Sequence, residues 1–436
     1  MKFRRPMAFA VGAVAVTLLA TACAPSAPTP GEGQTTTSGE CADGGTTLSV
    51  WSWRTEDEKQ YQTIFDVFEK QNSCITIEFQ AFKNTEYLQI LQTGLGGSDG
   101  PDVAQVRAYG QLQPFVQGGN LVAIDDIVDG LDGINPTVLD GAKGLEDGKV
   151  YGVPFATQTL QVFYNKKIFA EHNLDVPTTW DELIQVNDTL LEAGVTPLSV
   201  GAKDSWIIPI VHDIFGSAQY GGTDFQTKIL AGDTDFNSAE YVASIETFQS
   251  LQKYMPKDVV GVSYTDSQIL FTSEQAAMFP GGSFELAFFQ SQNPDLDLGV
   301  FQAPPPPGSV LDHGVTPSFA DGSWAINTAS EKQEAAATLL NWMATAEFGQ
   351  LMADELKQFS PISGVTYSDP VMAEEWRLYE QASSPYLQLV SFRYGEPLGS
   401  SLMGEGGQEL LLGQLTPAEV AEKIQTGVST WFTPND

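Results

Sequence analysis

The chain has 436 residues and a formal net charge of −34, because 55 acidic residues stand against 21 basic ones. This excess of negative charge repels a polyanion, so the composition excludes nucleic acid binding. The length is sufficient for two domains with cores of their own, and the acidity is typical of a solubilising surface outside the cell.

The N-terminus predicts export from the cell. Basic residues at positions 2–5 precede an apolar run at 7–20, which is too short for a membrane-spanning helix and is typical of a secretory signal. The sequence Leu-Ala-Thr-Ala-Cys at 19–23 resembles a bacterial lipobox, although its leucine stands four places before the cysteine instead of the usual three. We expect a signal peptide at 1–22 and a lipid anchor on Cys23. The alternative is an ordinary secretory signal in which Cys23 is incidental.

The segment that follows predicts a tether. Residues 23–45 are rich in Pro, Thr, Ser and Gly and have almost no apolar side chains to bury. We therefore expect a flexible linker that holds a globular body near the membrane. Cys41 and Cys74 each precede a predicted strand, and outside the cell they are expected to pair, the alternative being two free thiols. His172, His212 and His313 are isolated in the sequence and show no zinc-ligand spacing.

The first part of the body alternates strands and helices. The expected elements are a strand at 46–53, a helix at 56–71, a strand at 75–79, a helix at 87–94 and a third strand that opens at 100–106. This alternation predicts a parallel, doubly wound sheet. Ligands of such sheets bind beyond the carboxyl ends of the strands, which draws attention to residues 53–56, 82–84 and 107–109.

A second unit begins near residue 153. Its expected elements are a strand at 160–164, a helix at 180–193 capped by Thr179, a strand at 196–200, helices at 241–254 and 266–271, a strand at 276–279 and a stiff proline-rich loop at 303–308. A strand at 321–327 and a helix at 331–345 follow, and the chain beyond 361 is expected to be mostly helical. Of the aromatic residues in these elements, Trp51 and Trp342 are assigned to the core and Trp180 to packing.

Several segments occur in an order that resembles a known family. They are Gly-Pro-Asp-Val at 100–103 before 119–126, Gly-Lys-Val-Tyr-Gly-Val-Pro at 148–154 before 163–167, Pro-Thr-Thr-Trp-Asp-Glu-Leu at 177–183, residues 271–278 before Gly-Ser-Phe at 282–284, and Ala-Ile-Asn at 325–327 before Asn-Trp-Met at 341–343. Together they resemble the extracellular solute-binding proteins of ABC importers, specifically the carbohydrate-binding family that includes maltose-binding protein. The resemblance covers roughly residues 46 to 432.

The resemblance implies an α/β protein with the two-lobed, type II periplasmic-binding-protein-like fold, in which the ligand cleft lies between lobes joined by a hinge. One lobe is expected at 44–154 plus 317–365 and the other at 155–316 plus 366–436, with the hinge near 154–157. The implied function is the capture of a carbohydrate, expected to be an oligosaccharide, by lobe closure and its delivery to the permease of an ABC importer. We expect a monomer without cofactor, metal or catalytic activity, anchored at the extracellular face of the membrane.

A sugar site needs aromatic planes for the C–H faces and polar groups for the hydroxyls. By the resemblance, Trp206 and Phe284 stack on sugar, Gln158 takes hydroxyls, and Arg393 and Tyr394 match a late aromatic site. The full set of expected ligand contacts is Trp53, Arg54, Glu56, Asn84, Arg107, Tyr109, Gln158, Asp204, Trp206, Phe284, Glu285, Asp321, Trp324, Arg393 and Tyr394.

Two alternatives remain open from the sequence. The same fold can bind another solute, such as a polyamine, a peptide or an iron complex, although the aromatic residues near the strand ends favour sugar. A secreted glycoside hydrolase would need two opposed carboxylates at a scissile bond, and so acidic a chain offers many pairs. No nucleophile, metal or phosphate-loop motif supports catalysis.

Overall fold

The protein is described by a computed structural model that covers residues 41, 44–97 and 100–434. The expected signal peptide, Cys23 and most of the expected linker lie outside the described residues. Within the described ranges, none of the helices combines the length and the apolar character that a bilayer span requires.

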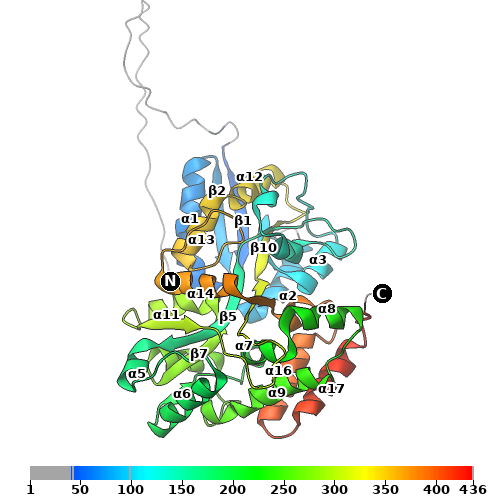
Figure 1. Cartoon of the computed structure of the whole chain (residues 1–436). Helices are drawn as coiled ribbons and strands as arrows, with labels where there is room; N and C mark the ends of the chain where they lie inside the picture. The colour runs from blue at the N-terminus through cyan, green and yellow to red at the C-terminus, as the bar shows by residue number, and fades with distance from the viewer. Residues whose placement is uncertain (1–40, 42–43, 98–99, 435–436) are drawn as a thin grey trace, which may run out of the picture. The chain divides into compact units, whose positions relative to one another are not determined.

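The first sheet has the strand order β2–β1–β3–β10–β4 (Figure 1). Its strands are β1 (Thr46–Ser52), β2 (Ile75–Ala81), β3 (Val103–Arg107), β4 (Val153–Pro154) and β10 (Gly322–Ile326). The parallel pairing of β1 with β2 and β3 confirms the predicted β-α-β-α-β arrangement, whereas β10 runs antiparallel to β3 and β4. We call this sheet lobe 1, together with its helices α1 (Glu58–Gln71), α2 (Asn84–Leu95), α3 (Gln113–Gln117), α4 (Pro136–Leu139), α12 (Gln333–Met343) and α13 (Ala346–Leu356).

The second sheet has the order β11–β9–β5–β7–β6, and β8 also pairs with β5. Its strands are β5 (Thr157–Asn165), β6 (Thr196–Leu198), β7 (Ala276–Gly282), β8 (Leu298–Phe301), β9 (Thr316–Ala320) and β11 (Ser383–Pro385). We call this sheet lobe 2, together with α5 (Lys166–Glu171), α6 (Trp180–Glu192), α7 (Ile207–Tyr220), α8 (Gly222–Ala231), α9 (Ala239–Ser250), α10 (Tyr264–Thr272), α11 (Leu286–Gln292), α14 (Pro370–Gln381), α15 (Leu387–Val390), α16 (Gly399–Leu411) and α17 (Pro417–Val428). Figure 1 shows α5, α6, α7 and α11 gathered around β5 and β7.

Each lobe has its own apolar core. In lobe 1 the core includes Leu48, Tyr61 and Trp324. In lobe 2 the consecutive residues Val162 and Phe163 of β5 enter different clusters, because neighbouring side chains of a strand point to opposite faces of the sheet. The second sheet is therefore covered by apolar side chains on both faces.

The chain crosses between the sheets more than once. It leaves lobe 1 between β4 and β5 and returns between β9 and β10, at Asp321. The expected return at residue 317 is therefore too early, because β9 pairs with β5 in the second sheet, with Thr157 opposite Ala320. A further crossing lies between α13 and α14, where Thr157 N–H donates to the carbonyl of Phe359 at 2.8 Å.

Local sequence signals at two element ends have clear structural counterparts. Thr179 caps α6 in a capping box, in which its hydroxyl accepts the N–H of Glu182 at 3.3 Å and the Glu182 carboxylate accepts the N–H of Thr179 at 3.0 Å.

The parallel register of β1 and β2 brings their preceding residues together. Cys41 and Cys74 form a disulfide there, with a Cα–Cα separation of 5.4 Å.

The assignment of Trp51 to the core is wrong. Trp51 is half-buried on one face of β1, against Phe82 at a ring separation of 4.9 Å. Trp53, which follows the strand, is only 2% exposed and belongs to the core of lobe 1. The buried face of β1 carries Leu48, Val50 and Ser52, so Trp51 lies on its other face.

Candidate functional site

The chain after β1 is held in a fixed turn. Ser52 Oγ donates to Gln105 Oε1 of β3 at 2.7 Å and accepts the backbone N–H of Arg54 at 3.1 Å. Arg54 donates from Nε to the carboxylate of Asp57, and its Nη2 lies 3.7 Å from Glu56 Oε1. Burial acts to lower the pKa of Arg54, but these carboxylates outweigh it and raise the pKa above its ordinary value. Arg54 therefore stays charged beyond the carboxyl end of β1.

Arg107, the last residue of β3, gathers side chains from three other segments. Its Nη2 donates to Asn84 Oδ1 at 2.7 Å, and its Nη1 lies 3.6 Å from Asp321 Oδ1. The guanidinium carbon stands 3.9 Å from the ring centroid of Trp53, which is cation–π geometry. Four of the expected ligand residues thus meet at one edge of the first sheet.

Gln158 connects this group to lobe 2. Its Nε2 donates to Asp321 Oδ2 at 3.2 Å and to Gln358 Oε1 at 2.6 Å, and its Oε1 accepts from Ser283 Oγ at 2.7 Å. Gln158 is fully buried. Because its partners come from two of the crossings and from the end of β7, it lies where the chain passes between the lobes.

Glu285 and Tyr264 form the lobe 2 side of the site. The Tyr264 hydroxyl and Gln268 Nε2 both donate to the Glu285 carboxylate, the latter at 2.8 Å. Glu285 is fully buried, and burial raises its pKa to about 7 against the lowering effects of Tyr264, Gln268 and the charge of Arg54. Burial also raises the pKa of Tyr264 well above its ordinary value, with Arg54 again opposing. Since Arg54 belongs to lobe 1, its charge acts on this pair from the other lobe.

Trp206 supplies an exposed aromatic plane beside Tyr264. The two rings stand 4.7 Å apart at 63°, and Trp206 is 43% exposed. Asp204, two residues earlier, accepts the backbone N–H of Tyr264 on Oδ2 at 2.8 Å. The loop before α7 and the start of α10 are therefore fixed to each other, next to Glu285.

Arg393 approaches the end of β3 from lobe 2. Its Nε donates to Ser400 Oγ of α16 at 2.8 Å. Its backbone lies so close to Gly110 that a Cβ on that glycine would stand 1.8 Å from the Arg393 carbonyl oxygen. The charge of Arg393 acts to lower the pKa of Arg107, which stands at about 10 chiefly because of burial. Arg393 thus belongs with the residues gathered around Arg107.

The structure does not bring all expected ligand residues together. Trp324 is fully buried in the core of lobe 1 and is reassigned to packing, because it offers no surface to a ligand. Trp53 is covered by Arg107 and has almost no free surface. Tyr109 and Tyr394 line a cavity of about 720 Å³ with residues of both lobes. Phe284 is half-buried against the core of lobe 2, with its ring over Gly282.

Other residues of the site were missed from the sequence. Tyr264, Gln268 and Gln358 hold the predicted residues in place, yet none of them follows a strand of the predicted sheet. A signal for Tyr264 existed in Ser263 and Asp266, which form a capping box and fix the start of α10. For Gln358, which follows α13, the sequence carried no comparable signal.

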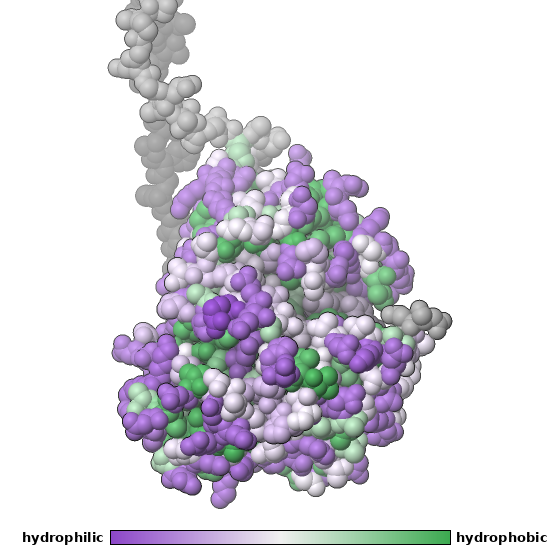
Figure 2. Space-filling view, in the orientation of Figure 1, coloured by the Kyte–Doolittle hydropathy of each residue, from purple (hydrophilic) through white to green (hydrophobic). Residues whose placement is uncertain are grey.

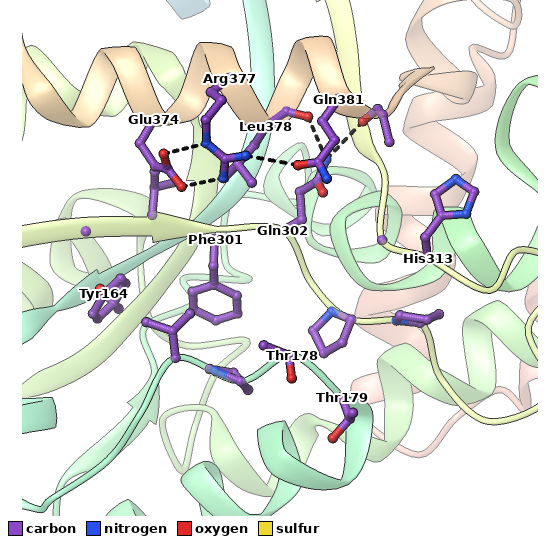
Figure 3. A pocket seen from close by; sticks show the side chains of 18 of the residues that line it. Tyr164, Thr178, Thr179, Phe301, Gln302, His313, Glu374, Arg377, Leu378 and Gln381 are labelled. Carbon is purple, nitrogen blue, oxygen red and sulfur yellow. Dashed lines mark hydrogen bonds and ion pairs between the residues drawn. The ribbon is translucent and has the colours of Figure 1, made fainter.

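A second cavity, of about 1110 Å³, lies within lobe 2 (Figure 3). Along α14 it is bordered by Arg377, whose guanidinium donates to Glu374 Oε1 at 2.7 Å and to Gln381 Oε1 at 3.1 Å. Tyr164 and Phe301 lie on the opposite side in Figure 3. None of the expected ligand residues lines this cavity, so it is separate from the candidate site.

The chemistry of the candidate site is that of recognition. Its groups are guanidinium and amide donors, carboxylate acceptors and the exposed indole of Trp206. Glu285 has the raised pKa of a general acid, but its carboxyl group is fully buried and bonded to Tyr264 and Gln268. Among residues 41, 44–97 and 100–434, no cluster of three or more His, Cys, Asp or Glu side chains has the arrangement of a metal site.

The chain is similar to several proteins that are named as binding proteins or receptors. The chain is 24% identical over 322 residues to the multiple sugar-binding protein of Streptococcus mutans serotype c, covering 71% of this chain and 73% of the relative. It is also 24% identical over 336 residues to the mannitol-binding protein of Pseudomonas aeruginosa, covering 72% of each. Among solved structures, the bacterial solute receptor AcbH, described with an exclusive preference for β-D-galactopyranose, superposes with a TM-score of 0.77 at 21% identity, over 89% of this chain and 100% of the receptor.

The structural likeness shows that the fold is the two-lobed, type II fold of periplasmic binding proteins. A family profile described as bacterial extracellular solute-binding protein matches residues 51–350, more than half of the chain. The chain therefore belongs to the bacterial extracellular solute-binding protein family.

Proposed function

We propose that this protein captures a carbohydrate in the cleft between its lobes and delivers it to the permease of an ABC importer. The observation that carries the proposal is the meeting of polar side chains from both lobes around Arg107, Gln158 and Glu285, next to the exposed ring of Trp206. Donors, acceptors and an aromatic plane within one cleft match the edge and the faces of a sugar ring.

Capture proceeds by lobe closure without chemical change of the ligand. Arg107, Asn84 and Asp321 belong to the lobe 1 side, whereas Trp206 and Glu285 belong to lobe 2, so one ligand touches both sides only when the lobes approach. A ligand that makes more contacts in the closed state shifts the protein toward that state. The chain crosses between the two sheets at 154–157, at Asp321 and between α13 and α14, and these crossings form the proposed hinge.

The protein acts at the extracellular face of the membrane, tethered by a lipid on Cys23 and a flexible linker. Substitution Cys23→Ala is expected to release an intact, ligand-binding protein into the medium. Membrane association that persists in this variant would refute the anchor and leave the binding function unaffected.

A thermal-shift screen over mono- and oligosaccharides tests the main proposal. A sugar that binds only the folded state raises the melting temperature by mass action, by an amount that grows with ligand concentration. We expect at least one sugar to do so and to be recovered unchanged. Stabilisation by a polyamine, a peptide or an iron complex alone would refute the carbohydrate, and release of shorter sugars would refute the absence of catalysis.

A further inference from the structure

The cavity between the lobes that Tyr109 and Tyr394 line is distinct from the candidate site. Its volume of about 720 Å³ falls within the range of small-molecule sites, roughly 300–1,000 Å³. Lobe 1 contributes Tyr109 and residues within 137–145, and lobe 2 contributes α8, β9, β11 and the segment after α17. Arg107 and Glu285, around which the candidate site is built, do not line this cavity. It therefore calls for an explanation of its own.

Aromatic side chains form part of the wall. Tyr394, Trp431 and Phe432 all line the cavity. The indole of Trp431 is held in place, because its Nε1 donates to the carbonyl oxygen of Pro397 at 2.9 Å and its ring lies close over Gly395, where a Cβ would stand 2.4 Å from it. Trp431 is only half-buried, so part of the fixed ring stays free. Such a plane suits the C–H face of a sugar ring.

A donor and an acceptor stand next to each other in the same wall. Gln226 of α8 donates from Nε2 to Ser391 Oγ at 2.8 Å, which fixes both side chains. Among the residues that the structure describes, Gln226 Oε1 meets no donor and the hydroxyl proton of Ser391 meets no acceptor. Each hydroxyl of a sugar both donates and accepts, so two neighbouring hydroxyls can satisfy this pair.

Ser384 of β11 adds a further polar group at the cavity. It lines the cavity and is only 4% exposed, and its Oγ has no hydrogen-bond partner within the described part of the chain. A buried hydroxyl without a partner costs free energy that a hydroxyl of a bound molecule can recover.

The charges at the cavity favour a neutral ligand. Of the described residues that line it, Asp140 alone is charged. Its carboxylate pairs with Lys143 Nζ at 2.6 Å, and its side chain is 62% exposed, so water also solvates it. The cavity thus offers no cation to an anionic ligand and no unmatched anion to a cationic one.

We propose that this cavity is a second carbohydrate site, which holds one neutral sugar ring against Trp431 with its hydroxyls on Gln226 and Ser391. The inference goes beyond the proposed function, because the side chains that carry that function lie outside the cavity. One protein molecule then binds two sugar molecules, one at the candidate site and one in this cavity.

Isothermal titration calorimetry tests the proposal on the whole protein. The probes are D-glucose, D-galactose, D-xylose, maltose and lactose, and we expect two binding events for at least one of them. Gln226→Leu keeps the size of the side chain and removes both of its polar groups. It should weaken one event about tenfold or more and change the other less than about threefold. Trp206→Ala should do the reverse, since Trp206 belongs to the candidate site.

The control is Gln381→Leu, the same exchange at the separate cavity along α14, which should leave both events unchanged. Ligand-free melting temperatures check folding, and Ser391→Ala replaces the Gln226 variant if that variant does not fold. A single event that depends on Trp206 and not on Gln226 overturns the second site and upholds the proposed function. An event that depends only on Gln226 supports the second site and refutes the candidate one. One event weakened by both variants means that a single ligand fills both places, which overturns the inference, and no binding of any probe refutes both proposals.

Discussion

At the level of single residues, the exposed fraction of an aromatic side chain separates a role in binding from a role in folding. Trp206 is 43% exposed and makes an edge contact with Tyr264, whereas Trp324 is fully buried beside Tyr61, Phe65 and Phe155. Substitution of an exposed ring removes ligand contact, and substitution of a buried ring leaves a cavity. Substitutions of Trp206 and Trp324 can therefore be compared directly, one for its effect on binding and the other for its effect on folding.

Substitution Trp206→Ala is expected to weaken sugar binding about thirtyfold or more, because loss of a central aromatic contact commonly costs about 2 kcal/mol or more. Its ligand-free melting temperature should remain nearly unchanged. Substitution Trp324→Ala should instead lose about 3–5 kcal/mol of unfolding free energy. Calorimetric titration and denaturant unfolding of both variants measure these quantities. A collapse of stability in the Trp206 variant would assign that residue to the core.

The buried carboxyl group of Glu285 predicts a dependence of stability on pH. Burial raises its pKa from 4.5 to about 7 in the folded protein, so between these values the folded state binds the proton more tightly than the unfolded state. Binding of this proton stabilises the folded state in full below pH 4.5, the ordinary pKa of the group. This stabilisation, roughly 3 kcal/mol, is lost as the pH rises through about 7, the pKa in the folded protein. Tyr264, Gln268, Arg54 and Glu56 are the groups that act on this carboxyl.

Substitution Glu285→Gln is expected to flatten the fall in unfolding free energy between pH 4.5 and pH 7, measured by urea denaturation at a series of pH values. The fall should not vanish, because Glu375 of α14 is also fully buried and its pKa is also raised by burial. The variant Glu375→Gln should also flatten the fall, and the double variant should show the smallest slope. A slope identical to wild type in the Glu285 variant would contradict the raised pKa.

At the level of elements, the two lobes touch where the 3₁₀ turn after β3 (Tyr109–Gln111) meets the segment after α15. Gly110 makes this contact possible, because any side chain there would overlap the backbone of Arg393. Ala108 and Tyr109 of lobe 1 also belong to the apolar cluster of lobe 2. A side chain added at Gly110 would therefore separate the two lobes at this contact.

Substitution Gly110→Ala is expected to hold the lobes apart and to weaken sugar binding by about tenfold or more, because the closed state becomes strained while each lobe remains folded. Titration calorimetry measures the affinity. Gly96→Ala is the control, since its added methyl group would meet only atoms of its own helix end, the nearest at 3.7 Å. Wild-type affinity in the Gly110 variant would show that this contact is not part of the closed state.

At the level of the whole molecule, local sequence patterns predicted many of the helices and strands, whereas pairings between segments distant in sequence were missed. The alternation of β1, α1, β2, α2 and β3 was predicted from apolar periodicity, and the strand-end rule found Asn84 and Arg107. The short strands β8, β9 and β11 were missed, because their pairing partners are distant in sequence and prolines lie within two of them. Tyr264 and Gln358 were missed for the same reason, since only the fold brings them to the site.

The hydrophilic character of the surface agrees with the excess of acidic residues in the sequence. The face of the molecule in Figure 2 is mostly hydrophilic, with hydrophobic residues scattered among the polar ones. A net charge of −34 keeps such molecules apart in solution through mutual repulsion.

Closure of the lobes gives the last prediction. A ligand that contacts Arg107 of lobe 1 and Trp206 of lobe 2 at once gains free energy only when the lobes approach, so saturation should shift the protein toward a more compact state. Small-angle X-ray scattering should show a smaller radius of gyration with saturating sugar than without it. The Trp206→Ala variant, measured at the same sugar concentration, should remain closer to the ligand-free value because it is less occupied. An unchanged radius at proven saturation would mean that the hinge does not move on binding.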